Sequence, residues 1–133
     1  MMDLSIGDAA ARTGVKAATI RYYEQIGLVA PPPRTEGKQR RYGQDAIARL
    51  NFIRHARALG FEIHAIRDLL ALKGEPDRPC ADADGIAVRR LVEVDRRIAQ
   101  LTALRAELQR MVDGCGHGRV SDCRVIEALA AGA

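Results

Sequence analysis

Three cysteines carry the most specific chemistry in this 133-residue chain: Cys80, Cys115 and Cys123. Three thiols are too few, and odd in number, for a disulfide framework, so we expect them to be reduced. Single cysteines are more often small apolar core residues, but these three lie in or beside segments that contain Gly, Pro and Asp. Thiolates prefer soft metal ions to magnesium or calcium. The cysteines therefore predict a metal site.

Two of the thiols belong to one loop. Cys115 and Cys123 are separated by a glycine-rich segment that can fold around an ion, and His117 lies between them as an additional candidate ligand. A short helix is predicted from Arg124 to Ala131. The amide dipoles at its start would favour a thiolate at Cys123. Residues 114–133 are accordingly predicted to form a metal-binding loop and a C-terminal helix.

A long helix over residues 84–113 is predicted to separate this loop from Cys80. Its apolar residues recur at intervals of three and four: Val88, Leu91, Val94, Ile98, Leu101, Leu108 and Val112. About 45 Å of helix is too long for Cys80 and Cys115 of one chain to share an ion. The stripe needs a partner helix, or else packs back on the preceding helices. If two such helices run antiparallel, the partner subunit's Cys80 arrives beside the loop thiols.

The first 75 residues predict a DNA-binding domain. Ser5 precedes a short helix that ends at Thr13-Gly14, and a second helix is expected over residues 15–25. The spacing of Ala10, Gly14 and Ile20 lets two short helices cross closely, which is typical of a helix-turn-helix.

The outward face of the second helix is the predicted DNA-reading surface. Lys16, Arg21 and Tyr22 can face a major groove while Ile20 and Tyr23 face the interior. Arg21 is the best candidate, because its planar fork can bind a guanine edge or a phosphate. The alternative for the tyrosines, Tyr42 included, is a packing role.

A basic wing is predicted after the proline run at residues 31–33. Residues 34–42 alternate around a glycine turn, as a small hairpin would. Further helices are expected over residues 44–59 and from residue 61 to 70, followed by a linker at residues 76–83. Phosphate contacts that set register without reading bases are predicted for Arg34, Arg40, Arg41, Tyr42 and Arg54.

Composition and charge agree with this organisation. Aromatic residues make up 4% of the chain and charged residues 29%, which favours a mostly α protein over a β-sandwich. The net charge of +4 lies entirely within residues 1–75, which hold 12 basic and 8 acidic side chains. A polyanion partner is therefore expected for this part alone. No apolar run approaches bilayer-spanning length, so we expect a soluble, cytoplasmic protein without a membrane partner.

Several literal strings resemble the MerR family of bacterial transcription regulators. They are TIRYYE at residues 19–24, IGL at 26–28, RRY at 40–42 and LGF at 59–61. The resemblance spans Ser5 to Leu129. It implies a winged helix-turn-helix domain, an antiparallel coiled-coil dimerisation helix and an effector loop. It further implies a homodimer on a two-fold symmetric promoter operator that activates RNA polymerase by distorting double-stranded DNA.

The resemblance also bears on the metal. In the similar metal-sensing branches, a loop cysteine pair alone goes with monovalent copper or silver, whereas a third thiolate at the position of Cys80 goes with zinc, cadmium, lead or mercury. The expected cofactor is therefore a soft divalent ion, although the loop length is close to that of the copper branch.

Three alternatives remain open at this stage. A copper or silver sensor of the same family is the nearest. A redox-sensing iron-sulfur regulator would need His117 and the partner subunit's Cys80 together as ligands. An enzyme is disfavoured, because paired carboxylates, a Ser/His/Asp set and a phosphate-cradling glycine loop are all missing from the sequence.

Overall fold

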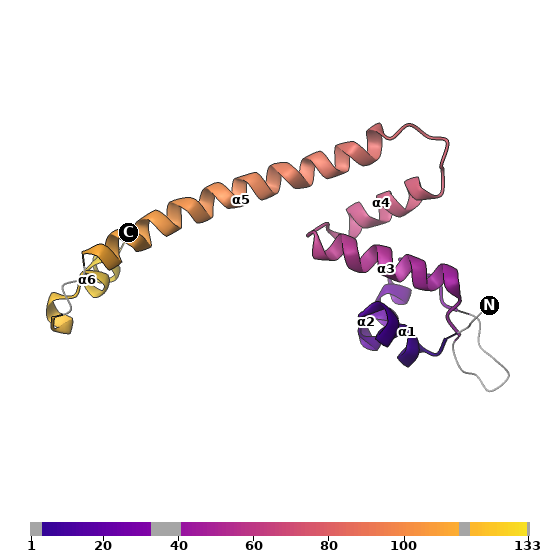
Figure 1. The fold of residues 1–133 in the computed structure, drawn as a ribbon, viewed down its shortest axis with the longest axis horizontal. Helices are drawn as coiled ribbons and strands as arrows, with labels where there is room; N and C mark the ends of the chain where they lie inside the picture. The colour runs from indigo at the N-terminus through magenta and orange to yellow at the C-terminus, as the bar shows by residue number, and fades with distance from the viewer. Residues whose placement is uncertain (1–3, 33–40, 115–117, 133) are drawn as a thin grey trace. The chain divides into compact units, whose positions relative to one another are not determined.

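The computed structural model describes residues 4–32, 41–114 and 118–132 (Figure 1). The chain divides into two units, Met1–Ile86 and Ala87–Ala133. Helices account for nearly all regular structure in the described segments, which confirms the predicted mostly α fold. None of these helices is long and apolar enough to cross a membrane.

Helices α1 (Ile6–Thr13) and α2 (Ala17–Gln25) form the helix-turn-helix. The Ser5 hydroxyl accepts a hydrogen bond from the Asp8 amide at 3.2 Å and so caps α1. Gly14 ends α1 with φ 76°, a left-handed conformation that favours glycine. The α1 and α2 helices pack against each other as the small residues between them predicted.

The turn between these helices is tied by one buried hydroxyl. Thr13 Oγ1 donates to the Ala9 carbonyl at 2.8 Å and accepts from the Val15 amide at 3.2 Å. Because Val15 is bound in this way and buried, α2 begins at Ala17 rather than at the predicted residue 15.

Helices α3 (Gln44–Ala58) and α4 (Ile63–Lys73) complete the first unit. The α4 helix begins two residues later than predicted, because Gly60 turns the chain at φ 86° and Glu62 is extended. Helix α3 packs on α1 and α4. A single core results, containing Ala9, Val15, Ile20, Tyr23, Leu28, Val29, Tyr42, Leu50, Ile53, Ala56, Ile66 and Leu70.

Only the end of the predicted wing lies within the described residues. Leu4 and Tyr42 form an antiparallel bridge, with both backbone amides donating to the opposite carbonyl at 2.7 and 2.8 Å. This bridge joins the segment before α1 to the segment before α3. Residues 33–40, which include the rest of the predicted hairpin, are outside the described part of the chain.

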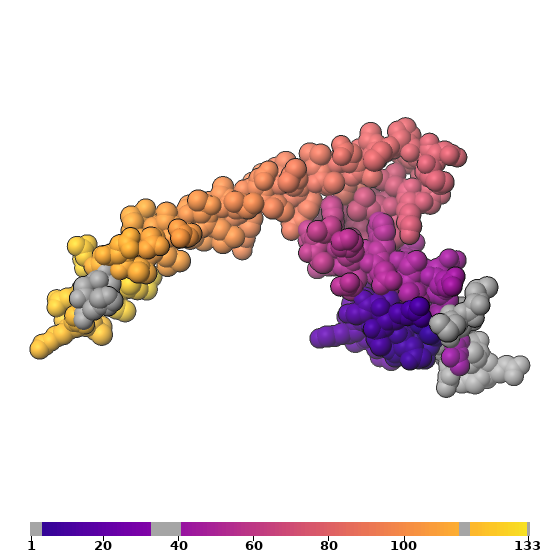
Figure 2. Space-filling model, viewed as in Figure 1, coloured from indigo at the N-terminus to yellow at the C-terminus, as the bar shows by residue number. Residues whose placement is uncertain are grey.

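Helix α5 (Ala81–Asp113) contains 33 residues and is therefore about 50 Å long. It begins three residues before the predicted start, because the Asp84 amide donates to the Cys80 carbonyl at 2.9 Å and closes a first turn there. Beyond its end, a short 3-10 helix η1 (Val120–Asp122) packs on α6 (Arg124–Ala131). On the face shown in Figure 2, neither η1 nor α6 covers the middle of α5, which is coloured orange.

Candidate nucleic-acid interface and thiolate site

Helix α2 presents its predicted DNA-reading residues to solvent. Lys16 precedes the first turn and is exposed, as is Arg21, while half of the Tyr22 surface is accessible at 50%. On the opposite side, Ile20 and Tyr23 are buried in the core. The predicted inward and outward faces of α2 are therefore the observed ones, and the outward face carries two cations and a phenol.

Arg54 extends this basic surface from α3 to the helix-turn-helix. Its Cδ lies 3.4 Å from the point where a Cβ would stand on Gly14. The aliphatic stem of Arg54 therefore packs against the turn between α1 and α2, while the residue remains exposed. A guanidinium held at this turn is well placed to bind a phosphate that flanks a groove occupied by α2.

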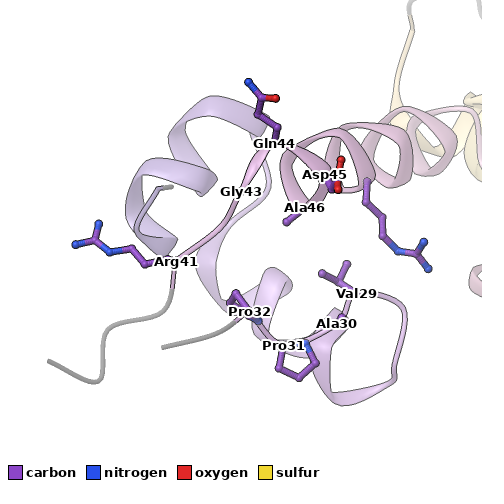
Figure 3. A pocket seen from close by; sticks show the side chains of 10 residues that line it. Val29, Ala30, Pro31, Pro32, Arg41, Gly43, Gln44, Asp45 and Ala46 are labelled. Atoms are coloured by element: carbon purple, nitrogen blue, oxygen red, sulfur yellow. The ribbon is translucent and has the colours of Figure 1, made fainter. Parts of the chain in front are cut away.

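A hollow of about 580 Å³ lies where the wing segment meets α3 (Figure 3). The residues that line it are Val29, Ala30, Pro31, Pro32, Arg41, Gly43, Gln44, Asp45, Ala46 and Arg49. The Arg41 side chain points away from this hollow in Figure 3, and the residue is partly exposed. The role of Arg41 as a phosphate contact stays a prediction. Arg34 and Arg40, predicted for the same role, lie outside the described residues.

Tyr42 requires a correction. Its side chain is fully buried, and its hydroxyl donates to Glu24 Oε2 at 2.8 Å. A side chain with no exposed surface has nothing to offer a phosphate, so the prediction of Tyr42 as a backbone contact is wrong. Its hydrogen bond instead joins the end of the wing to the C-terminal turn of α2, which fixes the reading helix relative to the wing segment.

Two arginines that the sequence did not single out hold the loop after α2. Arg49 Nε donates to the Leu28 carbonyl at 2.7 Å, and Arg67 Nη2 donates to the Ile26 carbonyl at 2.8 Å. Ile26 is the C-cap of α2, so the bond from Arg67 satisfies a carbonyl that the helix end leaves without an intrahelical partner, and the bond from Arg49 satisfies a carbonyl of the following loop. No signal in the sequence separates these arginines from those predicted to bind phosphate, because the distinction depends on contacts between distant segments.

Each of the two described cysteines stands immediately before a helix. Cys80 is exposed, and its carbonyl accepts the first hydrogen bond of α5 from Asp84. Cys123 is half-buried, and its carbonyl accepts from the Glu127 amide at 2.9 Å in α6. Cys123 thus stands at the start of α6, where backbone amide groups favour negative charge, and a thiolate there stays a prediction.

The described residues on either side of the loop from Cys115 to Cys123 lie close together. Gly114 precedes this loop, and a Cβ placed on it would stand 3.2 Å from Arg124 Cγ and 3.3 Å from the Arg110 carbonyl oxygen. The residues next to the two thiol positions are thus in contact. Cys115 and His117 themselves fall outside the described residues. Within the described residues, no three His, Cys, Asp or Glu side chains gather as a ligand group.

Comparison with known proteins identifies the architecture. A family model described as "MerR HTH family regulatory protein" matches residues 4–73, and a second, "MerR, DNA binding", matches residues 47–111. The chain therefore belongs to the MerR family. As a member, it is a DNA-binding transcription regulator and not an enzyme, in agreement with the prediction from its sequence.

Two curated relatives and one solved structure are similar over nearly the whole chain. HTH-type transcriptional regulator ZntR of Escherichia coli (strain K12) is 42% identical over 132 residues, covering 96% of this chain and 93% of ZntR. Heavy metal-dependent transcription regulator 2 of Rhizobium meliloti (strain 1021) is 38% identical over 129 residues, covering 97% and 88%. The crystal structure of PbrR691 from Ralstonia metallidurans CH34 in complex with lead(II) matches with a TM-score of 0.80 and 29% identity, covering 95% of this chain and 98% of PbrR691.

Proposed function

We propose that this protein is a metal-responsive transcriptional regulator that acts as a homodimer on promoter DNA. It responds to a soft divalent ion, zinc, cadmium, lead or mercury, that is bound through cysteine thiolates. The similarity to a heavy metal-dependent regulator and to a regulator crystallised with lead(II) supports a response to metal. In this proposal the protein acts in the cytoplasm, where promoter DNA is accessible.

The observation that carries the proposal is the uncovered apolar stripe of α5. Its large apolar side chains include Leu91, Ile98, Leu101, Leu108 and Val112, which are 52–62% exposed. Heptad spacing places these residues along one seam, and such a seam is stabilised by burial against another helix. A second copy of α5 running antiparallel would supply that surface along the full length of the helix.

Antiparallel pairing also assembles the metal site. Cys80 stands just before α5, and the loop with Cys115 and Cys123 follows its end. In an antiparallel pair the beginning of one helix lies beside the end of the other, so the partner subunit's Cys80 meets Cys115 and Cys123 twice per dimer. Three thiolates select a soft ion over magnesium or calcium. His117 is the candidate for a further ligand.

The first unit would bind the DNA. Lys16, Arg21 and Tyr22 would enter the major groove, and Arg34, Arg40, Arg41 and Arg54 would bind phosphates beside it. Two such units related by the dimer axis fit a two-fold symmetric operator of double-stranded DNA.

Metal and DNA would be coupled through the dimer. An ion that joins thiolates of two subunits favours one arrangement of the paired α5 helices and therefore one relative position of the two reading units. DNA bound to both units must bend or twist to follow that arrangement, at a free energy that depends on its sequence. This distortion would let RNA polymerase engage both promoter elements and activate transcription.

The test is a competition titration of zinc, cadmium, lead, mercury and monovalent copper, with transcription from the target promoter as a second readout. We expect Cys80→Ser and Cys123→Ser to lose both tight divalent binding and activation. Ser121→Ala, a substitution in the same loop at a residue without a predicted ligand role, is the matched control and should leave both unchanged.

Three results would overturn parts of the proposal. A full divalent response in Cys80→Ser would remove the ligand supplied by the partner. Activation by monovalent copper or silver alone would identify the copper alternative. A coloured protein with stoichiometric iron and sulfide, whose promoter activity follows redox state, would identify the iron-sulfur alternative.

A further inference from the structure

One arginine bridges the chain on both sides of Cys80. Arg78 Nη1 lies 3.0 Å from Glu75 Oε2, and Arg78 Nη2 lies 2.8 Å from Asp82 Oδ2. Glu75 belongs to the segment before Cys80, and Asp82 belongs to the first turn of α5. The guanidinium therefore spans the cysteine and connects the linker to the helix.

The backbone around Cys80 is held by the same segment. The Arg78 amide donates to the Glu75 carbonyl at 3.0 Å and closes a turn, and the Cys80 carbonyl accepts from Asp84 at 2.9 Å. Pro79 fixes its own φ between these two bonds. Few backbone torsions between this turn and α5 are therefore free to rotate. The Arg78 guanidinium restrains the remaining ones, because it binds both Glu75 and Asp82.

We propose that Arg78 is a positioning residue that holds Cys80 ready to coordinate the metal ion of the partner subunit. The inference rests on the proposed function. It adds that the ion pairs of Arg78 with Glu75 and Asp82 fix the position of Cys80, the third thiolate of the metal site. A ligand that is already held in its bound position loses less conformational freedom on binding, and the affinity rises accordingly.

An effect of the Arg78 charge and an effect of its position predict different results for Arg78→Lys. Three thiolates around one divalent cation form an anionic site, so a positive charge at Arg78 would favour metal binding wherever its atoms lie, and lysine would preserve that effect. If Arg78 instead positions Cys80, lysine does not replace it and binding weakens. Arg78→Lys separates the two, because lysine keeps the charge but lacks the planar fork that reaches two carboxylates at once.

The experiment titrates the intact protein with cadmium(II) against a competing chelator and follows the ultraviolet thiolate-to-cadmium absorption. We expect Arg78→Lys and Arg78→Ala each to weaken cadmium binding by about fivefold, the scale of two solvent-exposed ion pairs. The absorption per bound ion should also fall toward that of Cys80→Ser, because the third thiolate is engaged in a smaller fraction of the sites. All three ion-pair partners are about half exposed, so raising the salt should weaken cadmium binding more in the wild type than in Arg78→Ala.

Arg90→Ala is the matched control. Arg90 forms an ion pair with Glu93, at 3.2 Å and three residues apart on α5, ten residues along the chain from Cys80. It should leave cadmium affinity and absorption unchanged. Operator affinity of the metal-free protein should be unchanged in every variant, which excludes a general loss of folding.

Two outcomes would contradict the role of Arg78, and a third would contradict the proposed cross-subunit metal site. Stronger cadmium binding in Arg78→Ala, or wild-type affinity and absorption in Arg78→Lys, would show that Arg78 does not position the thiol. If Cys80→Ser itself bound cadmium with wild-type affinity and absorption, the proposed cross-subunit site would fail, and the role of Arg78 would fail with it.

Discussion

The two units of this chain bury their apolar residues in opposite ways. The first unit encloses a core of twelve residues from α1, α2, α3, α4 and the segments between them. The second unit, Ala87–Ala133, has no buried residue among those described, although it holds a row of large leucine, isoleucine and valine side chains. The first unit is completed by its own sequence, whereas the described residues of the second unit do not cover its apolar row.

In the proposed function, DNA reading belongs to the unit with a closed core, and metal sensing belongs to the unit without one. A reading surface must keep its shape in the absence of DNA, and a closed core provides that rigidity for α2. In the proposed function a sensor must respond to binding, and a helix stabilised mainly by a partner would change its arrangement when an ion joins the two subunits. Four predictions test this comparison.

The largest effect is expected from a charge in the α5 seam. Leu101 is 52% exposed, and a glutamate there would remove apolar burial worth about 2 kcal/mol and place a carboxylate in an apolar contact, once in each subunit. Leu101→Glu should therefore weaken dimerisation by at least a thousandfold, roughly the result of losing 4 kcal/mol. Sedimentation velocity across a range of protein concentrations measures this. Ala103→Glu, on the opposite side of the helix, should remain dimeric, and a dimeric Leu101→Glu would contradict the proposed seam.

The same leucine truncation should act differently in the two units. Leu50 is fully buried, and Leu50→Ala should lower the free energy of unfolding by about 3 kcal/mol at any protein concentration. Leu108→Ala should lower helix stability in a way that depends on protein concentration, because its contacts come from association. All three tyrosines are in the first unit, so tyrosine fluorescence follows that unit alone and circular dichroism follows both. A shift with Leu108→Ala that does not depend on concentration would mean that α5 is stabilised within one chain.

Arginines of the two units should differ in their effect on DNA. Arg21 is exposed on α2, and Arg21→Ala should weaken operator binding by about tenfold to a hundredfold if its fork reads a base. Arg89 is equally exposed but belongs to α5, and Arg89→Ala should leave operator affinity within about twofold of wild type. Fluorescence anisotropy at several salt concentrations provides the measurement. Equal losses in both variants would indicate a diffuse electrostatic attraction rather than a reading helix.

The smallest effects are expected from two glycines with opposite roles. Gly14 has φ 76° and would bring a Cβ to 3.4 Å from Arg54, so Gly14→Ala should destabilise the first unit by about 1 kcal/mol. Gly85 lies within α5 with nothing within 4 Å of its Cβ position, so Gly85→Ala should stabilise the helix by about 0.5–1 kcal/mol. Thermal unfolding of the two variants compares the signs. A gain in stability for Gly14→Ala would contradict the left-handed turn.

Sequence alone determined those features that depend on neighbouring residues. Periodicity and turn residues predicted every α-helix among the described residues, with ends displaced by at most three residues from those observed, but not the 3-10 helix η1. The helical spacing of apolar and polar residues predicted that Arg21 and Tyr22 lie on the outward face of α2. The heptad pattern predicted a long helix with an apolar stripe, because these properties repeat within one or two helical turns.

Tertiary structure decided which polar side chains serve the fold and which are left for a ligand. Tyr42 binds Glu24 eighteen residues away, Arg49 binds Leu28 across twenty-one residues, and Arg67 binds Ile26 across forty-one. A phenol or guanidinium has the same hydrogen-bonding groups whether it meets a carbonyl or a phosphate. Its role is fixed by the segment that folding brings within about 3 Å of it, and the local sequence does not contain that segment.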